Sequence, residues 1–157
     1  MAVKKKKKPN DNTLIRNRKA FHDYQILDRL EAGISLLGTE VKSCRAAGIS
    51  LSEAYVSIER GEAWLVGAHI NQYDHGNRFN HETKRRRRLL LHKKEIIRLN
   101  QQTREKGLTL IPLSFYIVRG KVKVSIGIGK GKTQGDKRDT LRKKQDDRDA
   151  RRAMSQR

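Results

Sequence analysis

The sequence is poor in cysteine, proline and aromatic residues. Its 157 residues include one Cys, two Pro, three Phe, four Tyr and one Trp. The single cysteine, Cys44, excludes an intramolecular disulfide and a zinc site built on several thiolates. One free thiol is compatible with a reducing cytoplasm, where we expect the protein to act.

Long hydrophobic runs are also missing. The most apolar stretch, residues 109–118, is shorter than the ~20 residues that a membrane helix needs. Residues 1–8 are rich in lysine, and no apolar run follows them, so a secretory signal peptide is not expected. We therefore expect no membrane partner.

Acidic residues are few compared with basic ones. The chain has 37 Lys and Arg against 17 Asp and Glu, which gives a formal net charge of +20. Self-repulsion of this size is normally relieved by a polyanion, so nucleic acid is the first candidate partner. The length of 157 residues allows one domain with tails, and a hydrophobic fraction of 35% implies a modest core, so a large two-lobed enzyme is excluded.

The surplus charge is concentrated in residues 1–19, 84–98 and 130–157. These three segments together hold the whole net charge of +20, so the rest of the chain is neutral in sum. The neutral remainder also contains nearly all the large apolar side chains. The chain therefore separates into a near-neutral core and three basic segments.

The core is predicted to be mostly β-strand. Apolar residues alternate with polar ones at 24–30 and 121–128, which predicts strands with one buried face. Residues 54–59 and 63–70 flank a short glycine-containing turn and predict a hairpin. Residues 108–118 are apolar on both faces. A strand buried on both sides favours a small closed antiparallel barrel of about six strands.

Two helices are predicted between the strands. Thr39 is a candidate N-cap for a short helix over residues 40–46. A longer helix is predicted to begin near His92, with Glu95 placed as in a capping box, and to end at Gly107. The expected fold class is α+β, mainly β, with two or three accessory helices.

The C-terminal segment differs from the core. It has hardly any large apolar residues, so in isolation it is expected to be disordered. Acid-before-base pairs, Asp139 with Lys143 and Asp147 with Arg151, would nevertheless support a helix. A basic segment of this kind is expected to fold on an anionic surface.

These features divide the chain into three parts. Residues 1–12 are expected to form a disordered basic arm, and residues 13–130 the barrel domain. Residues 131–157 are expected to form the basic tail, disordered alone and helical when bound.

Enzyme signatures are weak. Residues 131–133 end like a phosphate-binding loop, but Ile126 occupies the place of the first glycine, which disfavours an NTPase. The histidines lack metal-ligand spacing, and no nucleophile motif is present in the sequence. The sequence favours a binding protein without metal or cofactor over an enzyme.

The arginines at residues 85–88 could be a solvated loop, since most charge runs are. They precede the apolar residues 89–91, however, and follow Tyr73, Phe79 and His81. Arginines mixed with ring side chains suit folded or single-stranded RNA. DNA stays possible, although no helix-turn-helix is evident.

Six ordered motifs resemble the bacterial small protein B family, which binds transfer-messenger RNA. They are NRKAFHDY at 17–24, EAGI at 31–34, GTEVKS at 38–43, RLLLHKKEI at 88–96, TLIPL at 109–113, and Lys-Gly-Lys followed by Asp-Lys-Arg within 130–138.

This resemblance implies an OB-type barrel and a non-enzymatic role in trans-translation. The core would hold the tRNA-like domain of transfer-messenger RNA, and the complex would enter the empty A site of a stalled ribosome. The tail would become helical in the vacant mRNA channel, near the decoding centre of the small subunit. Elongation factor Tu and alanyl-tRNA synthetase would be indirect partners through the RNA, and the chain would act as a monomer. A structural ribosomal or assembly protein is the alternative, and a nuclease is a more distant one.

The resemblance also implies site residues. The RNA-binding positions of the family correspond to Asn17, His22, Glu31, Leu90, His92, Lys123, Lys130 and Lys132. We add the basic residues Arg18, Lys19, Lys42, Arg85, Arg86, Arg87 and Arg88 as RNA contacts. The tail residues expected to bind the ribosome are Asp136, Lys137, Arg138, Arg142, Lys143, Lys144, Arg148, Arg151 and Arg152. Because a carboxylate repels phosphate, Glu31 is expected to accept from a base amino group, a ribose hydroxyl or a neighbouring Arg.

Overall fold

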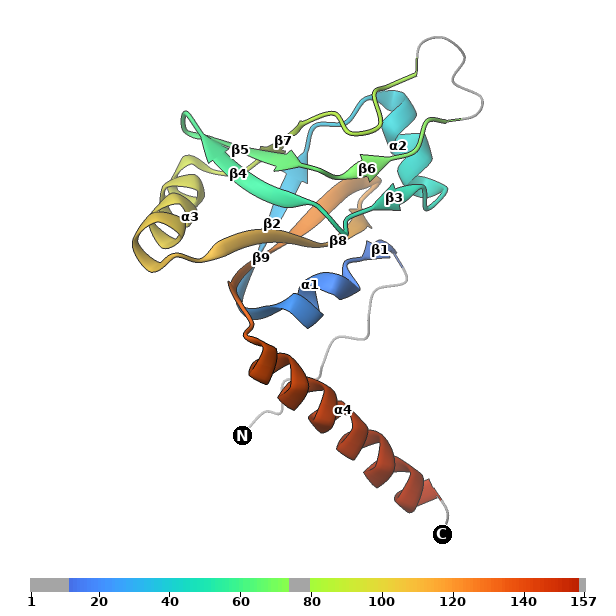
Figure 1. The fold of residues 1–157 in the computed structure, drawn as a ribbon. Helices are drawn as coiled ribbons and strands as arrows, with labels where there is room; N and C mark the ends of the chain where they lie inside the picture. Colours follow the sequence, from blue (N-terminus) through green and yellow to red (C-terminus); the bar gives the residue numbers. More distant parts are fainter. Residues whose placement is uncertain (1–11, 74–79, 156–157) are drawn as a thin grey trace.

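The computed structural model describes residues 12–73 and 80–155 (Figure 1). Except for Asn12, the predicted N-terminal arm at residues 1–12 lies outside the described residues, as does Phe79. Antiparallel strands and a few helices make up the rest, so the α+β, mainly β fold class is confirmed.

Most of the strands in the described residues belong to one antiparallel sheet. Its order is β1-β8-β9-β2-β7-β5-β4, and β3 and β6 pair separately. The strands are β1 Thr13–Arg16, β2 Tyr24–Ile34, β3 Ile49–Ser50, β4 Tyr55–Glu59, β5 Glu62–Val66, β6 His69–Ile70, β7 Arg87–Leu90, β8 Thr109–Val118 and β9 Lys121–Gly131. The helices are α1 Arg18–Asp23, α2 Gly38–Arg45, α3 Lys93–Lys106 and α4 Gln134–Ser155.

The sheet is curled, and its pairing does not close it into a barrel. Figure 1 shows β4 and β5 lying over β8 and β9, and β4 approaches β8 closely. The two edge strands of the described sheet, β1 and β4, are nevertheless not hydrogen-bonded to each other. Bulges between Ile26 and Asp28 and between Pro112 and Ser114 bend the long strands β2 and β8. Closure of the predicted barrel is therefore not confirmed.

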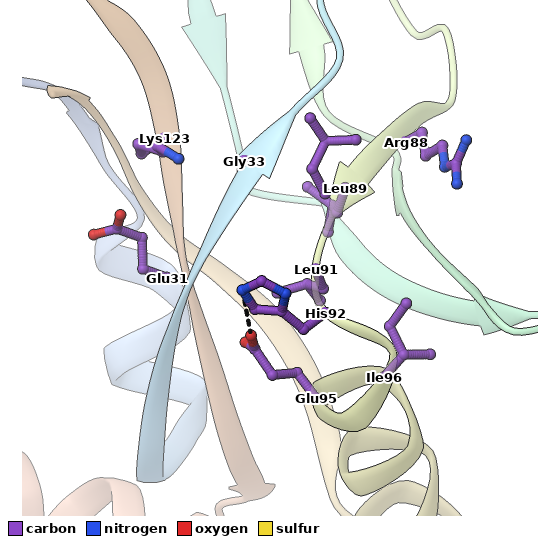
Figure 2. A pocket seen from close by; sticks show the side chains of 10 residues that line it. Glu31, Gly33, Arg88, Leu89, Leu91, His92, Glu95, Ile96 and Lys123 are labelled. Atoms are coloured by element: carbon purple, nitrogen blue, oxygen red, sulfur yellow. Dashed lines mark ion pairs between the residues drawn. The ribbon is translucent and has the colours of Figure 1, made fainter. Parts of the chain in front are cut away.

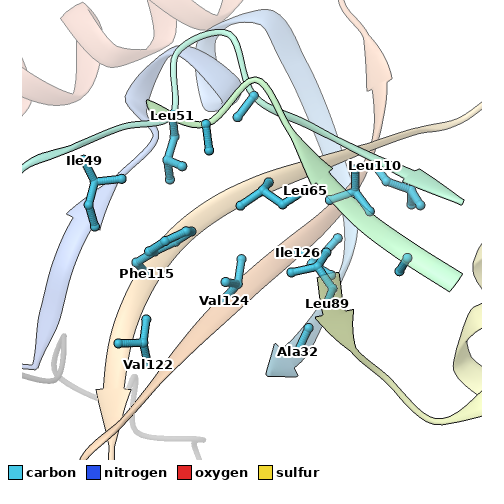
Figure 3. Packing of buried hydrophobic residues seen from close by; sticks show 14 of the residues in the cluster. Ala32, Ile49, Leu51, Leu65, Leu89, Leu110, Phe115, Val122, Val124 and Ile126 are labelled. Atoms are coloured by element: carbon cyan, nitrogen blue, oxygen red, sulfur yellow. The ribbon is translucent and has the colours of Figure 1, made fainter. Parts of the chain in front are cut away.

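The main core lies inside this curl (Figure 3). Val122, Val124 and Ile126 of β9 face it, as the alternating sequence predicts. They pack with Leu65 of β5 and Phe115 of β8, both of which are completely buried. The two layers of the curled sheet are thus held together by apolar burial.

The strand that was predicted to be buried on both faces is β8. Phe115 belongs to the main core, whereas Ile111 and Leu113 pack against Ala20 on α1. The short helix α1 therefore covers the outer side of β8 and has a defined place on the sheet.

Helix ends agree with the sequence in one case and differ in another. The long helix α3 follows His92 and ends at Gly107, which adopts a left-handed φ of 62°, so both ends lie where predicted. The N-cap His92 has no side-chain cap hydrogen bond, so the predicted capping box with Glu95 is not confirmed. The N-cap of α2 is Leu37 and not Thr39, because the Glu40 carboxylate accepts from the Leu37 backbone N–H at 2.9 Å. The prediction for Thr39 was wrong.

The basic tail forms the helix α4, which projects away from the sheet (Figure 1). Its predicted helical capacity is confirmed, and its disorder in isolation stays a prediction. Within the described residues, no helix has both the length and the apolar character needed to cross a membrane.

Candidate nucleic-acid interface

A hollow of about 400 Å³ lies where β2, β7, β9 and the start of α3 meet (Figure 2). Its lining combines cationic, acidic and apolar side chains from distant parts of the chain. The lining residues are Glu31, Gly33, Arg88, Leu89, Leu90, Leu91, His92, Glu95, Ile96 and Lys123. The structure thus brings together five predicted RNA-binding residues: Glu31, Arg88, Leu90, His92 and Lys123.

Strand register explains how these residues meet. Leu90 on β7 lies opposite Gly33 on β2, and Gly33 lies opposite Lys123 on β9. Residues directly opposite each other in antiparallel strands share one face of the sheet. A Cβ on Gly33 would lie 3.1 Å from the Cβ of Leu90, so glycine leaves room for Leu90 to lie across β2. The exposed Leu90 and the partly exposed Lys123 therefore lie on the same face of the sheet, and both line the hollow.

Tyr116 extends this row and was missed from the sequence. It lies opposite Lys123 on β8, and its hydroxyl donates to the Glu31 carboxylate at 2.6 Å. Burial raises the pKa of Tyr116, and the hydrogen bond and charge of Glu31 raise it further, so the hydroxyl stays a donor. Counting back across the hairpin turn from Lys123 would have identified Tyr116. Glu31 thus accepts from a protein group that fixes its orientation.

His92 and Arg88 form the rim of the hollow. The His92 side chain is 90% exposed, and its Nε2 lies 3.9 Å from the Glu95 carboxylate on the first turn of α3. Arg88 is exposed and reaches Glu62 at 3.3 Å. The Arg88 guanidinium and the His92 imidazole are thus both accessible to an anionic ligand.

An aromatic side chain adjoins this rim. Trp64 lies opposite Arg88 in the sheet, and the Arg86 guanidinium is 5.1 Å from the centre of its ring. Arg86 is exposed and pairs with Glu59 at 2.7 Å. The predicted mixture of arginine and aromatic groups is therefore present, but Trp64 supplies the ring.

The four arginines at residues 85–88 differ in exposure and in their ion-pair partners. Arg87 is 0% exposed and pairs with the equally buried Glu40, so its side chain is not accessible to RNA in this structure. Alternation along β7 turns Arg87 toward the core and Arg88 outward. Arg85 is partly exposed and also binds Glu40, at 2.5 Å. His81, proposed as a ring partner, is buried and hydrogen-bonded to the Ile70 carbonyl at 3.0 Å.

Asn17 is also buried, at 5% exposure. Its Nδ2 donates to the Leu51 and Pro112 carbonyls at 3.1 and 2.9 Å, and its Oδ1 accepts from Ala20 N–H at 3.2 Å. The amide thus caps α1 and fastens it to Leu51 and to Pro112 of β8. In this structure Asn17 holds α1 in place and offers little surface to RNA, so its RNA contact stays a prediction that its burial disfavours.

A second group of predicted residues lies at the other end of β2. His22 on α1 is half-buried, Arg18 and Lys19 are exposed, and Lys130 lies opposite Gln25 at the end of β9. Lys132 follows and is partly exposed. Gln25 and Glu31 are six residues apart on β2, so the rise along the strand separates the two groups by about 20 Å.

Lys42 and the tail residues lie outside both groups. Lys42 is on α2, with its ammonium 5.6 Å from the Tyr73 ring centre. Most of the predicted tail residues are exposed along α4, namely Asp136, Arg138, Arg142, Lys143, Lys144, Arg148, Arg151 and Arg152. Lys137 is partly exposed and contacts Asp23 of α1 at 3.3 Å.

The described residues contain no group of three or more His, Cys, Asp or Glu arranged to hold a metal ion. The carboxylates of the interface are engaged with Tyr116, His92 or arginines. The arrangement is that of a binding surface with cationic, apolar and hydrogen-bonding groups side by side.

Known proteins resemble this chain along nearly its whole length. The family model for the SmpB protein matches residues 14–156. The SsrA-binding protein of Levilactobacillus brevis is 51% identical over 154 residues, which are 98% of this chain and 98% of that protein. The SsrA-binding protein of Staphylococcus haemolyticus is 50% identical over 157 residues, covering 100% of this chain and 99% of that protein. A solved chain described as "tmRNA-SmpB: a journey to the center of the bacterial ribosome" is 42% identical, with a TM-score of 0.65 over 82% of this chain and 94% of its own.

Proposed function

The chain belongs to the SmpB protein family, and we therefore propose that it is an RNA-binding ribosome-rescue factor. It binds the tRNA-like domain of transfer-messenger RNA, also called SsrA RNA, and delivers it to the empty A site of stalled ribosomes. There it supports trans-translation.

The observation that carries this proposal is the hollow in Figure 2. Leu90 offers an apolar surface to a base or ribose, while Lys123 and Arg88 offer positive charge to phosphates. The Glu31 carboxylate, oriented by Tyr116, keeps free acceptor capacity for a base amino group or a ribose 2′-hydroxyl. Together these groups suit a folded RNA better than a uniform duplex backbone.

The tail has a separate role in this proposal. Its exposed cations line α4 with no apolar face to bury in protein, so phosphates are the natural partner. A basic helix of this kind occupies the vacant mRNA channel near the decoding centre. The second group, with His22, Lys130 and Lys132, contributes further RNA contacts close to the root of the tail.

The curled sheet corresponds to an OB-type barrel, in which β4 approaches β8 at the seam. The protein acts in the cytoplasm, as a monomer and without catalysis. Elongation factor Tu and alanyl-tRNA synthetase meet it indirectly, through the RNA.

Recovery of bound RNA tests the function. Affinity-tagged full-length chain, expressed in a bacterium, should enrich one transfer-messenger RNA far above ribosomal RNA. A Leu90→Asp and Lys123→Glu double variant should lose this enrichment, and Lys106→Glu, at the far end of α3, should keep it. Recovery of bulk ribosomal RNA alone would favour a structural ribosomal protein. Cleavage of the RNA in the presence of Mg²⁺ would favour a nuclease.

A further inference from the structure

The junction between the core and the tail is built by α1, the end of β9 and the first turns of α4. The Lys132 backbone N–H donates to the Asp23 carbonyl at 2.9 Å. The Lys132 ammonium donates to the Phe21 carbonyl and to the Thr140 hydroxyl, both at 3.1 Å. One side chain thus fastens α1 to the beginning of α4.

The start of α4 is defined by a reciprocal cap. The Thr133 N–H donates to the Asp136 carboxylate at 3.1 Å, and the Asp136 N–H donates to the Thr133 hydroxyl at 3.3 Å. This cap sets where the helix begins, while the direction of its axis depends on contacts between α1 and α4.

Lys132 makes one side-chain attachment between α1 and α4, and Asp23 makes another, to Lys137 on the first turn of α4. The Asp23 Oδ1 accepts from His22 Nδ1 at 2.9 Å and from the Lys137 ammonium at 3.3 Å. The Asp23 side chain is 26% exposed and that of Lys137 is 34% exposed, so the contact is partly shielded from water. The hydrogen bond from His22, helped by Lys137, holds the pKa of the Asp23 carboxyl below its usual range despite burial.

We propose that Asp23 is a positioning residue that sets the direction in which the tail leaves the core. His22 and Lys137 share one oxygen of its carboxylate, so a ligand that engages His22 acts on the atom that holds the tail. This coupling rests on the proposed function, because it assumes RNA at His22. The attachment itself does not depend on that assumption.

The charge of Lys137 has two competing uses. It was expected to meet the ribosome directly, whereas the structure directs it back toward the core. A partly exposed ion pair adds little stability, so its loss should redirect the tail without unfolding the protein. Lys144 is a matched control, because it lies two turns further along the same face of α4 and is exposed.

Distance measurements test the attachment directly. Spin labels are placed on full-length chain at Gln101→Cys on α3 and Gln145→Cys on α4, both exposed, while the buried Cys44 stays unlabelled. The parent should give a narrow distance distribution, Lys137→Met and Asp23→Asn should shift or broaden it, and Lys144→Met should not. A parent distribution as broad as that of Lys137→Met would overturn the proposal.

Exchanging the two charges separates positioning from direct ribosome contact. Lys137→Met should leave affinity for transfer-messenger RNA unchanged and reduce tagging on stalled ribosomes, by up to about a hundredfold if the tail is misplaced. The double variant Asp23→Lys with Lys137→Asp should restore the distance distribution and most of the tagging. Restored distances without restored tagging would mean that Lys137 binds the ribosome itself, and would overturn positioning as its role. If the parent bound no transfer-messenger RNA, the proposed function would fail, while the distance comparison would still decide the attachment.

Discussion

Glu40 and Arg87 form an ion pair in which both side chains are 0% exposed. The pair joins α2 to β7, and the Arg87 guanidinium also donates to the Ala68 and Thr83 carbonyls at 2.9 and 3.1 Å. Taking two charges out of water is costly unless each is fully hydrogen-bonded, and here the guanidinium has several acceptors. The pair therefore fixes the strand from which Arg88 and Leu90 reach the hollow.

Breaking this pair should be severe. Glu40→Gln leaves the Arg87 guanidinium buried without a counter-charge, so the free energy of unfolding should fall by about 3–5 kcal/mol. Chemical denaturation followed by circular dichroism measures the change. Glu59→Gln is the matched control, since Glu59 pairs with Arg86 on the surface, and it should have little effect. Equal effects of the two substitutions would contradict a structural role for the buried pair.

The same pair should make the protein sensitive to acid. Burial alone raises the pKa of Glu40, but hydrogen bonds from Arg85, the Leu37 backbone and Arg87 outweigh it and hold the pKa below its ordinary value of 4.5. A carboxyl with a lowered pKa in the folded state contributes stability that is complete above pH 4.5 and is lost as the pH falls through the folded value. The free energy of unfolding, measured from neutral pH downward, should therefore decline below about pH 4.5. The decline should persist in high salt, because a buried pair is poorly screened.

Periodicity predicted the long strands and α3 well. Val122, Val124 and Ile126 alternate strictly, so the buried face of β9 was evident, and Gly107 marked the end of α3. The short helix α1 was missed because its six residues hold too few apolar positions to show a period. Its existence depends on the cap by Asn17 and on packing against β8, both of which are tertiary contacts.

The sequence predicted most of the residues that line the hollow, but not which of the neighbouring arginines are exposed. Glu31, Leu90, His92 and Lys123 do share one hollow, a grouping that strand register creates and that the resemblance implied. The burial of Arg87 was not predictable, because a run of four like residues gives no sign of which one faces inward. The pairing of β7 with β2 and β5 decides that. Closure of the barrel is not confirmed, and a sequence can hardly predict it, because pairing between distant edge strands leaves no local pattern.

Lys123 should contribute one phosphate contact. Lys123→Gln should weaken binding of transfer-messenger RNA. A plot of the logarithm of the association constant against the logarithm of the salt concentration should become less steep by about 0.7–0.9. Filter binding or anisotropy over a salt series gives the slope. Lys106→Gln, on the exposed end of α3, removes the same charge and should leave the slope unchanged. A slope that stays constant in Lys123→Gln would place this lysine outside the RNA contact.

Tyr116 should act through Glu31. Tyr116→Phe keeps the ring and removes the hydroxyl that donates to Glu31 at 2.6 Å, so the carboxylate loses its fixed orientation. RNA affinity should fall by roughly threefold to tenfold, in line with about 0.5–1.5 kcal/mol for one hydrogen bond. Glu31→Gln combined with Tyr116→Phe should cost no more than Glu31→Gln alone. Additive losses would show that the two residues act independently.

The tail should be dispensable for RNA binding and essential for rescue. A chain ending at Lys132 keeps the hollow, Lys130 and the hydrogen bond from the Lys132 backbone to Asp23, so binding of the tRNA-like domain should be largely intact. Tagging on stalled ribosomes should be abolished, because the exposed cations of α4 are gone. Neutralising Arg148, Arg151 and Arg152 together to Gln should reproduce much of the tagging defect while preserving the junction at Asp23 and Lys137. Loss of RNA affinity in the truncated chain would instead assign the primary RNA contact to the tail, since the hollow would then be insufficient alone.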